Sequence, residues 1–210
     1  NIEEGLIKPF DPRREDVAEE ITAWAQHTET VGARIMMGPP ASRQVDTRGV
    51  DRILNSCREQ QLPVNVLAWG NIEAFASTAR RHPDVHLILD HLGLLQPFEP
   101  PVPEAPFAEL EQVLRLADLS NVAIKISGAC TLSRESYPFN DIWPYLEEII
   151  NRFGIERCMW GTDWTRAIEL ISPDDAVNAF RQTTRFNERD KAALMGGSLS
   201  DIYNWRPTHL

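Results

Sequence analysis

Two residues at the ends of apolar runs have side chains suited to acid–base chemistry. Asp163 closes the run Cys158–Asp163 (CMWGTD), and His91 closes the run Val85–His91 (VHLILDH). A carboxylate at the end of a buried strand must be hydrogen-bonded, metal-bound or catalytic, because burying an unpaired charge is costly. Histidine serves as a base or a ligand near neutral pH. We therefore take Asp163 and His91 as candidate catalytic residues; a loop-capping Asp and a structural His are the alternatives.

Three other side chains are candidates for substrate binding. Lys125 and Arg34 lie inside apolar runs, and neither residue type is normally buried without a partner. Each is as consistent with a structural ion pair as with contact to an anionic substrate. Trp69 ends a third run, where its ring either walls a pocket or packs in the core.

The elements that position these residues alternate between β-rich runs and amphipathic helices. Near-continuous hydrophobicity in the runs indicates strands that are covered on both faces, as in parallel sheets. The predicted strands are Gly5–Phe10, Gly32–Met37, Pro63–Trp69, Val85–His91, Val122–Ser127 and Cys158–Asp163. Between them, apolar residues recur at helical spacing, for example Val50, Ile53, Leu54 and Cys57, or Ile142, Leu146, Ile149 and Ile150.

The end of the chain is predicted to be helical. Ser172, Pro173 and two acidic residues form a strong helix start, with Ser172 as the N-cap, and the helix is expected to run to about Thr183. Two more helices are predicted near Glu188–Leu194 and Ser198–Trp205. The Pro-rich stretch Gln96–Pro106 follows the strand of His91 and is predicted to be a long loop at the active face.

Parallel strands joined by helices form either an open doubly wound sheet or a closed barrel. Polar residues end successive strands at equal spacing, at His91, Ser127 and Asp163, and barrel enzymes carry their chemistry at such strand ends. The phosphate-binding glycine motifs of open nucleotide-binding sheets are absent from the sequence. The sequence thus predicts an α/β fold, a single domain over residues 1–210 that forms part of a TIM (β/α)8 barrel. Since six strands are too few for that barrel, we expect its first two βα units to lie upstream of Asn1.

The composition indicates which kinds of partner and which location to expect. The 210 residues carry a formal net charge of -10, which opposes nucleic-acid binding. Membrane insertion is not expected, since the sequence has no apolar run of about 18 residues. Its three cysteines are widely spaced, which argues against a disulfide framework and fits a cytoplasmic location. The expected partner is a small anionic molecule, and homo-oligomerisation is left open.

An ordered set of segments resembles the amidohydrolase superfamily, specifically the amidohydrolase-related branch that includes 2-pyrone-4,6-dicarboxylate lactonase and sugar lactonases. The matching segments are Gly32-Ala33-Arg34, Leu87–Gly93 (LILDHLG), Ala123–Gly128 (AIKISG), Trp160–Trp164 (WGTDW) and a tail from Gly196 to Trp205. Singly each is weak, but their order covers nearly the whole chain. The resemblance implies a barrel of the metal-dependent hydrolase type.

The resemblance also implies roles for individual residues. Asp163 matches the last-strand aspartate that takes a proton from water, and His91 matches a histidine that binds or polarises the scissile carbonyl. Arg34 and Lys125 match positions that line the substrate pocket, and Arg134 is a looser candidate for gripping a substrate carboxylate. The implied reaction is hydrolysis of a small carboxylated or sugar-derived lactone.

Two departures from the family concern metal binding. The HxH pair of the first strand is absent from these residues, and the strand PVNVLAW has no His where metal-dependent members place one. The first departure agrees with two missing strands, whereas the second does not follow from missing strands and favours a metal-free lactonase. If a zinc or manganese ion is bound, His91 and Asp163 are the only ligands in this sequence, which are too few alone. The alternatives are a metal-dependent decarboxylase or hydratase and a non-catalytic barrel remnant. A barrel lacking two strands exposes strand edges, so we expect the isolated 210-residue chain to self-associate or dissolve poorly.

Overall fold

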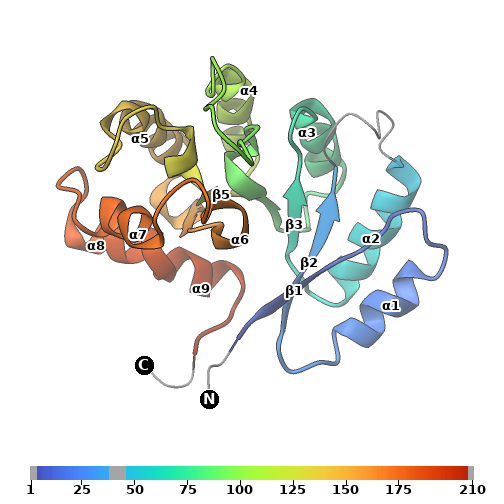
Figure 1. The fold of residues 1–210 in the computed structure, drawn as a ribbon. Helices are drawn as coiled ribbons and strands as arrows, with labels where there is room; N and C mark the ends of the chain where they lie inside the picture. The colour runs from blue at the N-terminus through green and yellow to red at the C-terminus, as the bar shows by residue number, and fades with distance from the viewer. Residues whose placement is uncertain (1–3, 38–45, 208–210) are drawn as a thin grey trace. The chain divides into compact units, whose positions relative to one another are not determined.

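The computed structural model describes residues 4–37 and 46–207, and these divide into two compact units (Figure 1). Unit 1 comprises residues 4–37, 46–89, 119–122 and 200–207. Unit 2 comprises residues 90–118 and 123–199. The candidate catalytic residues His91 and Asp163 both belong to unit 2, so the site can be built within that unit alone.

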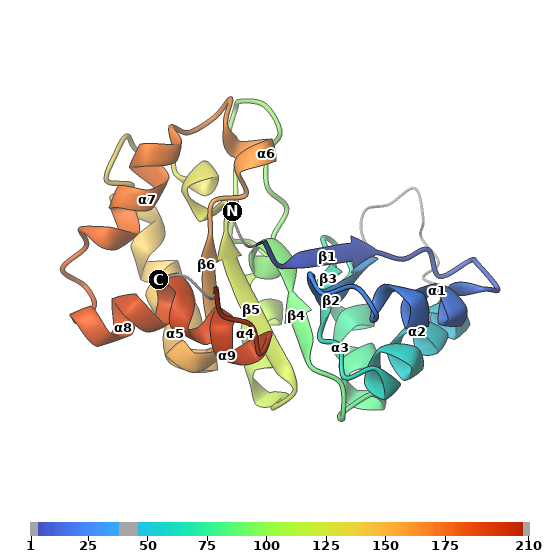
Figure 2. The ribbon, with the colours of Figure 1, turned by 90° about the horizontal axis from the view of Figure 1, so that it is seen from below.

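Unit 1 is a parallel sheet with helical crossovers. Its elements in chain order are β1 (Leu6–Pro9), α1 (Val17–Trp24), β2 (Thr30–Met36), α2 (Thr47–Glu59), β3 (Val64–Leu67), α3 (Ile72–Arg81) and β4 (Leu87–Leu89). The strands pair in sequence order, each parallel to the next. Figure 2 shows the three helices on one side of the strands. This confirms the predicted alternation of parallel strands and helices for the first four strands.

The core of unit 1 forms where the helical stripes meet the sheet. The stripe of α2 is buried as predicted, at Val50, Ile53, Leu54 and Cys57. The helix begins at Asp46, whose carboxylate accepts a hydrogen bond from the backbone N–H of Gly49 at 3.0 Å. Strands β3 and β4 are buried along their whole length, as expected for strands covered on both faces, whereas the two end residues of β1 are exposed and its two middle residues are half-buried.

Unit 2 contains the last two strands and most of the later helices. Its elements in chain order are α4 (Leu110–Leu114), β5 (Val122–Ser127), α5 (Trp143–Phe153), β6 (Cys158–Gly161), α6 (Trp164–Ala167), α7 (Pro173–Arg181) and α8 (Glu188–Ala192). The first residue of β5 and the last residues of α9 (Ser198–Ile202) are assigned to unit 1. Strands β5 and β6 pair in parallel, from Ile124 opposite Cys158 to Ser127 opposite Gly161. The carboxyl ends of both strands therefore lie at one edge, which is where the polar candidates of this unit were predicted to meet.

Aliphatic and aromatic side chains together form the core of unit 2. The predicted stripe of α5 is buried, including Leu146 and Ile149. Trp143 packs against Phe180 of α7, with ring centroids 5.0 Å apart, and Phe180 also lies 5.8 Å from the ring of Trp160 on β6. These contacts join α5, α7 and β6, and they fix the strand that leads to Asp163.

Several predicted boundaries were wrong at the ends of elements. The strands that carry the candidate catalytic residues end at Leu89 and Gly161, before His91 and Asp163. The last helix ends at Ile202 and not at Trp205. Helix α7 begins where expected, but the side chain of Ser172 makes no capping hydrogen bond. In the part of the chain that the structure describes, no helix is both long enough and apolar enough to cross a bilayer.

The three cysteines are buried and form no disulfide, as the sequence predicted for a chain without a disulfide framework. Burial raises the pKa of Cys57, Cys130 and Cys158 to about 12 each. We expect the native protein to resist thiol reagents at pH 8, because the reactive thiolate is scarce and shielded. Titration with a chromogenic disulfide should label few thiols in native protein and three in denaturant. Rapid labelling of native protein would contradict this.

Candidate functional site

The site begins with two turns in which non-glycine residues adopt left-handed backbone conformations. After β4, His91 and Leu92 have φ values of 53° and 62°, and Gly93 has 68°. After β6, Asp163 has a φ value of 53°. Such conformations are uncommon outside glycine, although His and Asp tolerate them better than most residues, and they cluster at functional sites. They end strand pairing and bring both side chains to the same place.

His91, Ser127 and Asp163 form a buried polar cluster. The Oγ of Ser127, at the end of β5, lies 2.9 Å from Nδ1 of His91. Oδ2 of Asp163 lies 3.5 Å from the same nitrogen. The side chains of His91 and Asp163 are 13% and 11% exposed, so the water that reaches them is limited. When Ser127 donates its hydroxyl proton to Nδ1, the ring carries its own proton on Nε2, which becomes a hydrogen-bond donor for a ligand.

Arg166 completes this cluster, and the sequence reasoning missed it. The residue lies in α6, three positions after Asp163, and its side chain is only 6% exposed. Its Nε donates a hydrogen bond to Oδ2 of Asp163. The signal in the sequence was the position of Arg166 three residues after Asp163, a spacing at which two side chains can meet on a helix. A guanidinium so placed supplies the positive charge that a buried carboxylate needs.

Gln96 was also not predicted, and it joins the loops that carry the cluster. Its side chain is buried, and Nε2 donates to the backbone carbonyl groups of His91 at 3.2 Å and Ser127 at 3.0 Å. Its Oε1 accepts from the guanidinium of Arg166. Gln96 begins the Pro-rich stretch, so the prediction that this loop lies at the active face is supported by its contacts.

Gly128 allows these groups to approach one another. It follows Ser127 in a left-handed conformation with a φ of 67°. A Cβ atom at this position would overlap the guanidinium of Arg166 and the carboxamide of Gln96, and would lie 3.1 Å from Oδ2 of Asp163. Only glycine therefore fits both the backbone and the space.

Two of the predicted substrate-binding residues lie in unit 2 but do not join this cluster directly. Nζ of Lys125 lies 3.9 Å from Oδ1 of the buried Asp90, which favours the ion-pair reading of Lys125. Arg134 is exposed, and it donates hydrogen bonds to the carbonyl groups of Pro103, at 2.9 Å, and Glu104. Arg134 thus braces the Pro-rich loop in this structure.

The other two predicted residues belong to unit 1. Arg34 is half-buried on β2, opposite Pro9 on one side and Asn65 on the other. Trp69 follows β3 and is 5% exposed, which agrees with the core-packing alternative for its ring. Arg34 lies within its predicted strand, whereas Trp69, which was predicted to end its strand, follows β3, which ends at Leu67.

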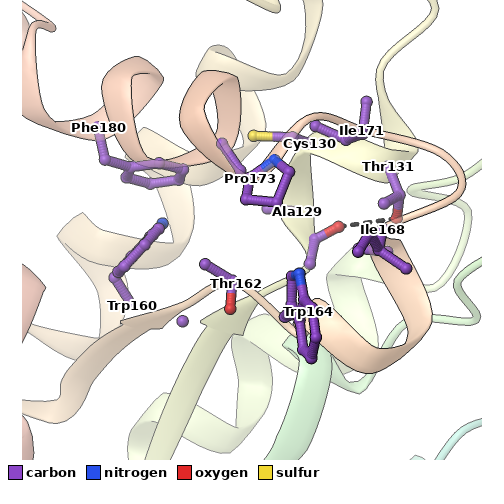
Figure 3. A pocket seen from close by; sticks show the side chains of 14 residues that line it. Ala129, Cys130, Thr131, Trp160, Thr162, Trp164, Ile168, Ile171, Pro173 and Phe180 are labelled. Carbon is purple, nitrogen blue, oxygen red and sulfur yellow. Dashed lines mark hydrogen bonds between the residues drawn. The ribbon is translucent and has the colours of Figure 1, made fainter.

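An apolar pocket lies beside the cluster of His91, Ser127 and Asp163, between β6 and the helices that follow it (Figure 3). Its walls include Trp160, Trp164, Pro173 and Phe180, and Thr162 lies at its side. The free space within it is close to that of one water molecule. We read this pocket as packing that supports the turn at Asp163, not as a substrate cavity.

The described residues do not provide a complete metal site. No group of three His, Cys, Asp or Glu side chains with suitable geometry occurs among residues 4–37 and 46–207. His91 and Asp163 are two donors, fewer than the three or more protein ligands of a catalytic zinc site. In addition, Oδ2 of Asp163 already accepts from the Arg166 guanidinium, whose charge repels a second cation. These residues therefore do not fit a resident metal by themselves.

Comparison with known proteins identifies relatives of this chain. It is 29% identical over 136 residues to 4-sulfomuconolactone hydrolase of Hydrogenophaga intermedia, covering 63% of this chain and 43% of that protein. It is 29% identical over 153 residues to L-fucono-1,5-lactonase of Burkholderia multivorans, covering 69% and 48%. The matched region thus spans about half the length of each of these two relatives.

A solved structure and a family model also match this chain. A crystal structure of an amidohydrolase from Burkholderia multivorans with bound zinc superposes with a TM-score of 0.81 at 23% identity, covering 96% of this chain and 74% of that one. At this identity the match concerns the fold alone. The family model described as Amidohydrolase matches residues 4–198. The chain therefore belongs to the amidohydrolase family.

Proposed function

We propose that this chain is part of a hydrolase that opens a small carboxylated or sugar-derived lactone, with Asp163 as the base that activates water. The observation that carries the proposal is the buried cluster in unit 2, where Oδ2 of Asp163 lies 3.5 Å from Nδ1 of His91. The resemblance to proteins named 4-sulfomuconolactone hydrolase and L-fucono-1,5-lactonase supports the choice of substrate class.

Asp163 and His91 have different roles in the proposed reaction. One oxygen of Asp163, Oδ2, is held by Arg166, and the other, Oδ1, accepts the proton of a water molecule as that water attacks the lactone carbonyl. His91, with its proton on Nε2, donates a hydrogen bond to the carbonyl oxygen as negative charge develops there. Collapse of the tetrahedral intermediate breaks the ring C–O bond, and the proton held by Asp163 passes to the leaving alkoxide.

The anionic part of the substrate is assigned in this proposal to Arg34, Lys125 and Arg134. These cationic side chains would hold an anionic substrate although the chain carries a formal net charge of -10. The proposal retains the sequence-based expectation of two further βα units in the full-length barrel, which would supply the remaining carbonyl-binding groups.

A panel of lactones tests the proposal directly. The full-length protein is expected to hydrolyse carboxylated or sugar-derived lactones faster than simple alkyl esters, as followed by acid release at constant pH. Full activity is expected to persist after dialysis against a chelator, because the strand Pro63–Trp69 has no His where metal-dependent members of the family place one. Turnover confined to zinc- or manganese-loaded protein would favour the decarboxylase or hydratase alternative, and no turnover of any lactone would remove the proposal.

A further inference from the structure

Arg166 is surrounded by acceptors that come from three separate loops. Its Nε donates to Asp163 in the turn after β6. Its Nη1 donates to the carbonyl group of Pro97 at 2.5 Å, and its Nη2 donates to Gln96, both in the loop after β4. Nη2 also lies 3.2 Å from Oγ1 of Thr131, in the segment after β5. One side chain therefore ties together the three turns that form the catalytic edge of unit 2.

These contacts leave Arg166 little capacity to bind a substrate. A guanidinium has five N–H donors, and the contacts to Asp163, Pro97, Gln96 and Thr131 engage four of them. The side chain is 6% exposed, so an incoming carboxylate would have to displace buried hydrogen bonds. An arginine that grips substrate needs two adjacent donors free for a bidentate contact. The geometry is that of a structural anchor.

The anchor acts on only one of the two carboxylate oxygens. Oδ2 of Asp163 receives the Arg166 hydrogen bond and lies near His91, whereas Oδ1 makes no hydrogen bond to any residue in the described part of the chain. Fixing one oxygen fixes the direction of the other, because the carboxylate is planar. A base that is held in one orientation needs less reorganisation when water attacks.

We propose that Arg166 is a positioning residue for Asp163: it holds Oδ2 so that Oδ1 faces the attacking water, and it does not bind substrate. This inference rests on the proposed function, since it assigns Asp163 the role of base. It follows that the substrate's negative charge is recognised elsewhere, and that the effect of Arg166 falls on the chemical step.

Steady-state kinetics of Arg166→Ala and Arg166→Lys in the full-length protein test this. With the best lactone of the panel, we expect Arg166→Ala to lower kcat by roughly 10- to 100-fold while KM changes less than about threefold. Guanidinium ion at tens of millimolar, compared with sodium chloride at equal ionic strength, should restore part of kcat. The kcat of Arg166→Lys should lie between those of the wild type and Arg166→Ala, because Lys keeps the charge of Arg but not its fork of N–H donors.

Arg185→Ala is the matched control. Arg185 lies in the same unit and donates to Glu147 at 2.7 Å in an exposed ion pair, so its removal should leave kcat and KM within about twofold. A raised KM with unchanged kcat in Arg166→Ala would overturn the proposal and make Arg166 a substrate-binding residue. An unchanged kcat and KM would overturn it as well.

Thermal melting separates this inference from the proposed function and covers a variant that folds poorly. The Tm losses of Arg166→Ala and Asp163→Ala should be non-additive in the double variant, because either change alone removes the contact between these two side chains. If wild-type protein opens no lactone but the Tm losses are non-additive, the proposed function fails and the anchoring of Asp163 stands. Additive Tm losses would overturn the anchoring itself.

Discussion

Replacement of Asp163 by Asn is expected to lower kcat/KM for lactone hydrolysis by roughly 10²- to 10⁴-fold, the contribution typical of a positioned general base. The amide is nearly the same shape as the carboxylate and its oxygen can still accept from Arg166, so the turn at Asp163 should persist. What is lost is the capacity to take a proton from water. Stopped-flow or initial-rate assays on the full-length protein measure the loss.

A conservative control shows that the loss is specific to this site. Asp174→Asn, in the exposed first turn of α7, makes the same chemical change away from the cluster and should keep kcat/KM within about twofold. If Asp163→Asn retained wild-type kcat/KM, Asp163 would be removed from the mechanism. A loss accompanied by an equal loss of folded protein would indicate a structural role instead.

Gly128→Ala is expected to have the second large effect, on both stability and activity. A left-handed alanine costs roughly 1–2 kcal/mol in backbone energy, and overlap in a packed site costs roughly 1–3 kcal/mol more. The new methyl group would collide with Arg166 and Gln96, which hold the turns of Asp163 and His91. A displacement of about 1 Å at the base is enough to lower kcat about 10²-fold. Chemical denaturation and kinetics would measure the two effects.

Gly70→Ala is the matched control for the cost in stability of a left-handed alanine. Gly70 has a φ of 68°, nearly equal to the 67° of Gly128, but no atom lies within 4 Å of the Cβ that alanine would add. Its loss of stability should therefore reflect the left-handed conformation alone and be smaller than that of Gly128→Ala. Equal losses of stability in the two variants would show that the crowding around Gly128 is relieved without cost.

The sequence predicted strands and helices well where the pattern is local. All six strands appear near their predicted positions, and the buried stripes of α2 and α5 are those expected from helical spacing. Ends of elements were predicted less well. The strands stop before His91 and Asp163 because these residues adopt left-handed conformations, which depend on contacts made across the fold and not on neighbouring residues.

The candidate site was predicted only in part, because some of its residues are marked by a local pattern and others by contacts made across the fold. Asp163 and His91 are recognisable because a polar residue after an apolar run stands out, and the structure brings them together. Gln96 and Arg166 lie 70 residues apart, and nothing in the spacing of either indicates that their side chains meet. Lys125 and Arg134 were predicted as pocket residues chiefly from the family resemblance, whereas their observed partners are Asp90 and backbone carbonyl groups.

The Pro-rich loop is attached to the rest of unit 2 at two places. Its first residues are fixed by the bonds of Gln96 and Pro97 to Arg166, and its later part is fixed by the bonds of Pro103 and Glu104 to Arg134. Residues 98–102 lie between these two attachments. Under the proposed function, we expect changes in that short segment to alter substrate preference while Asp163 and His91 keep their positions.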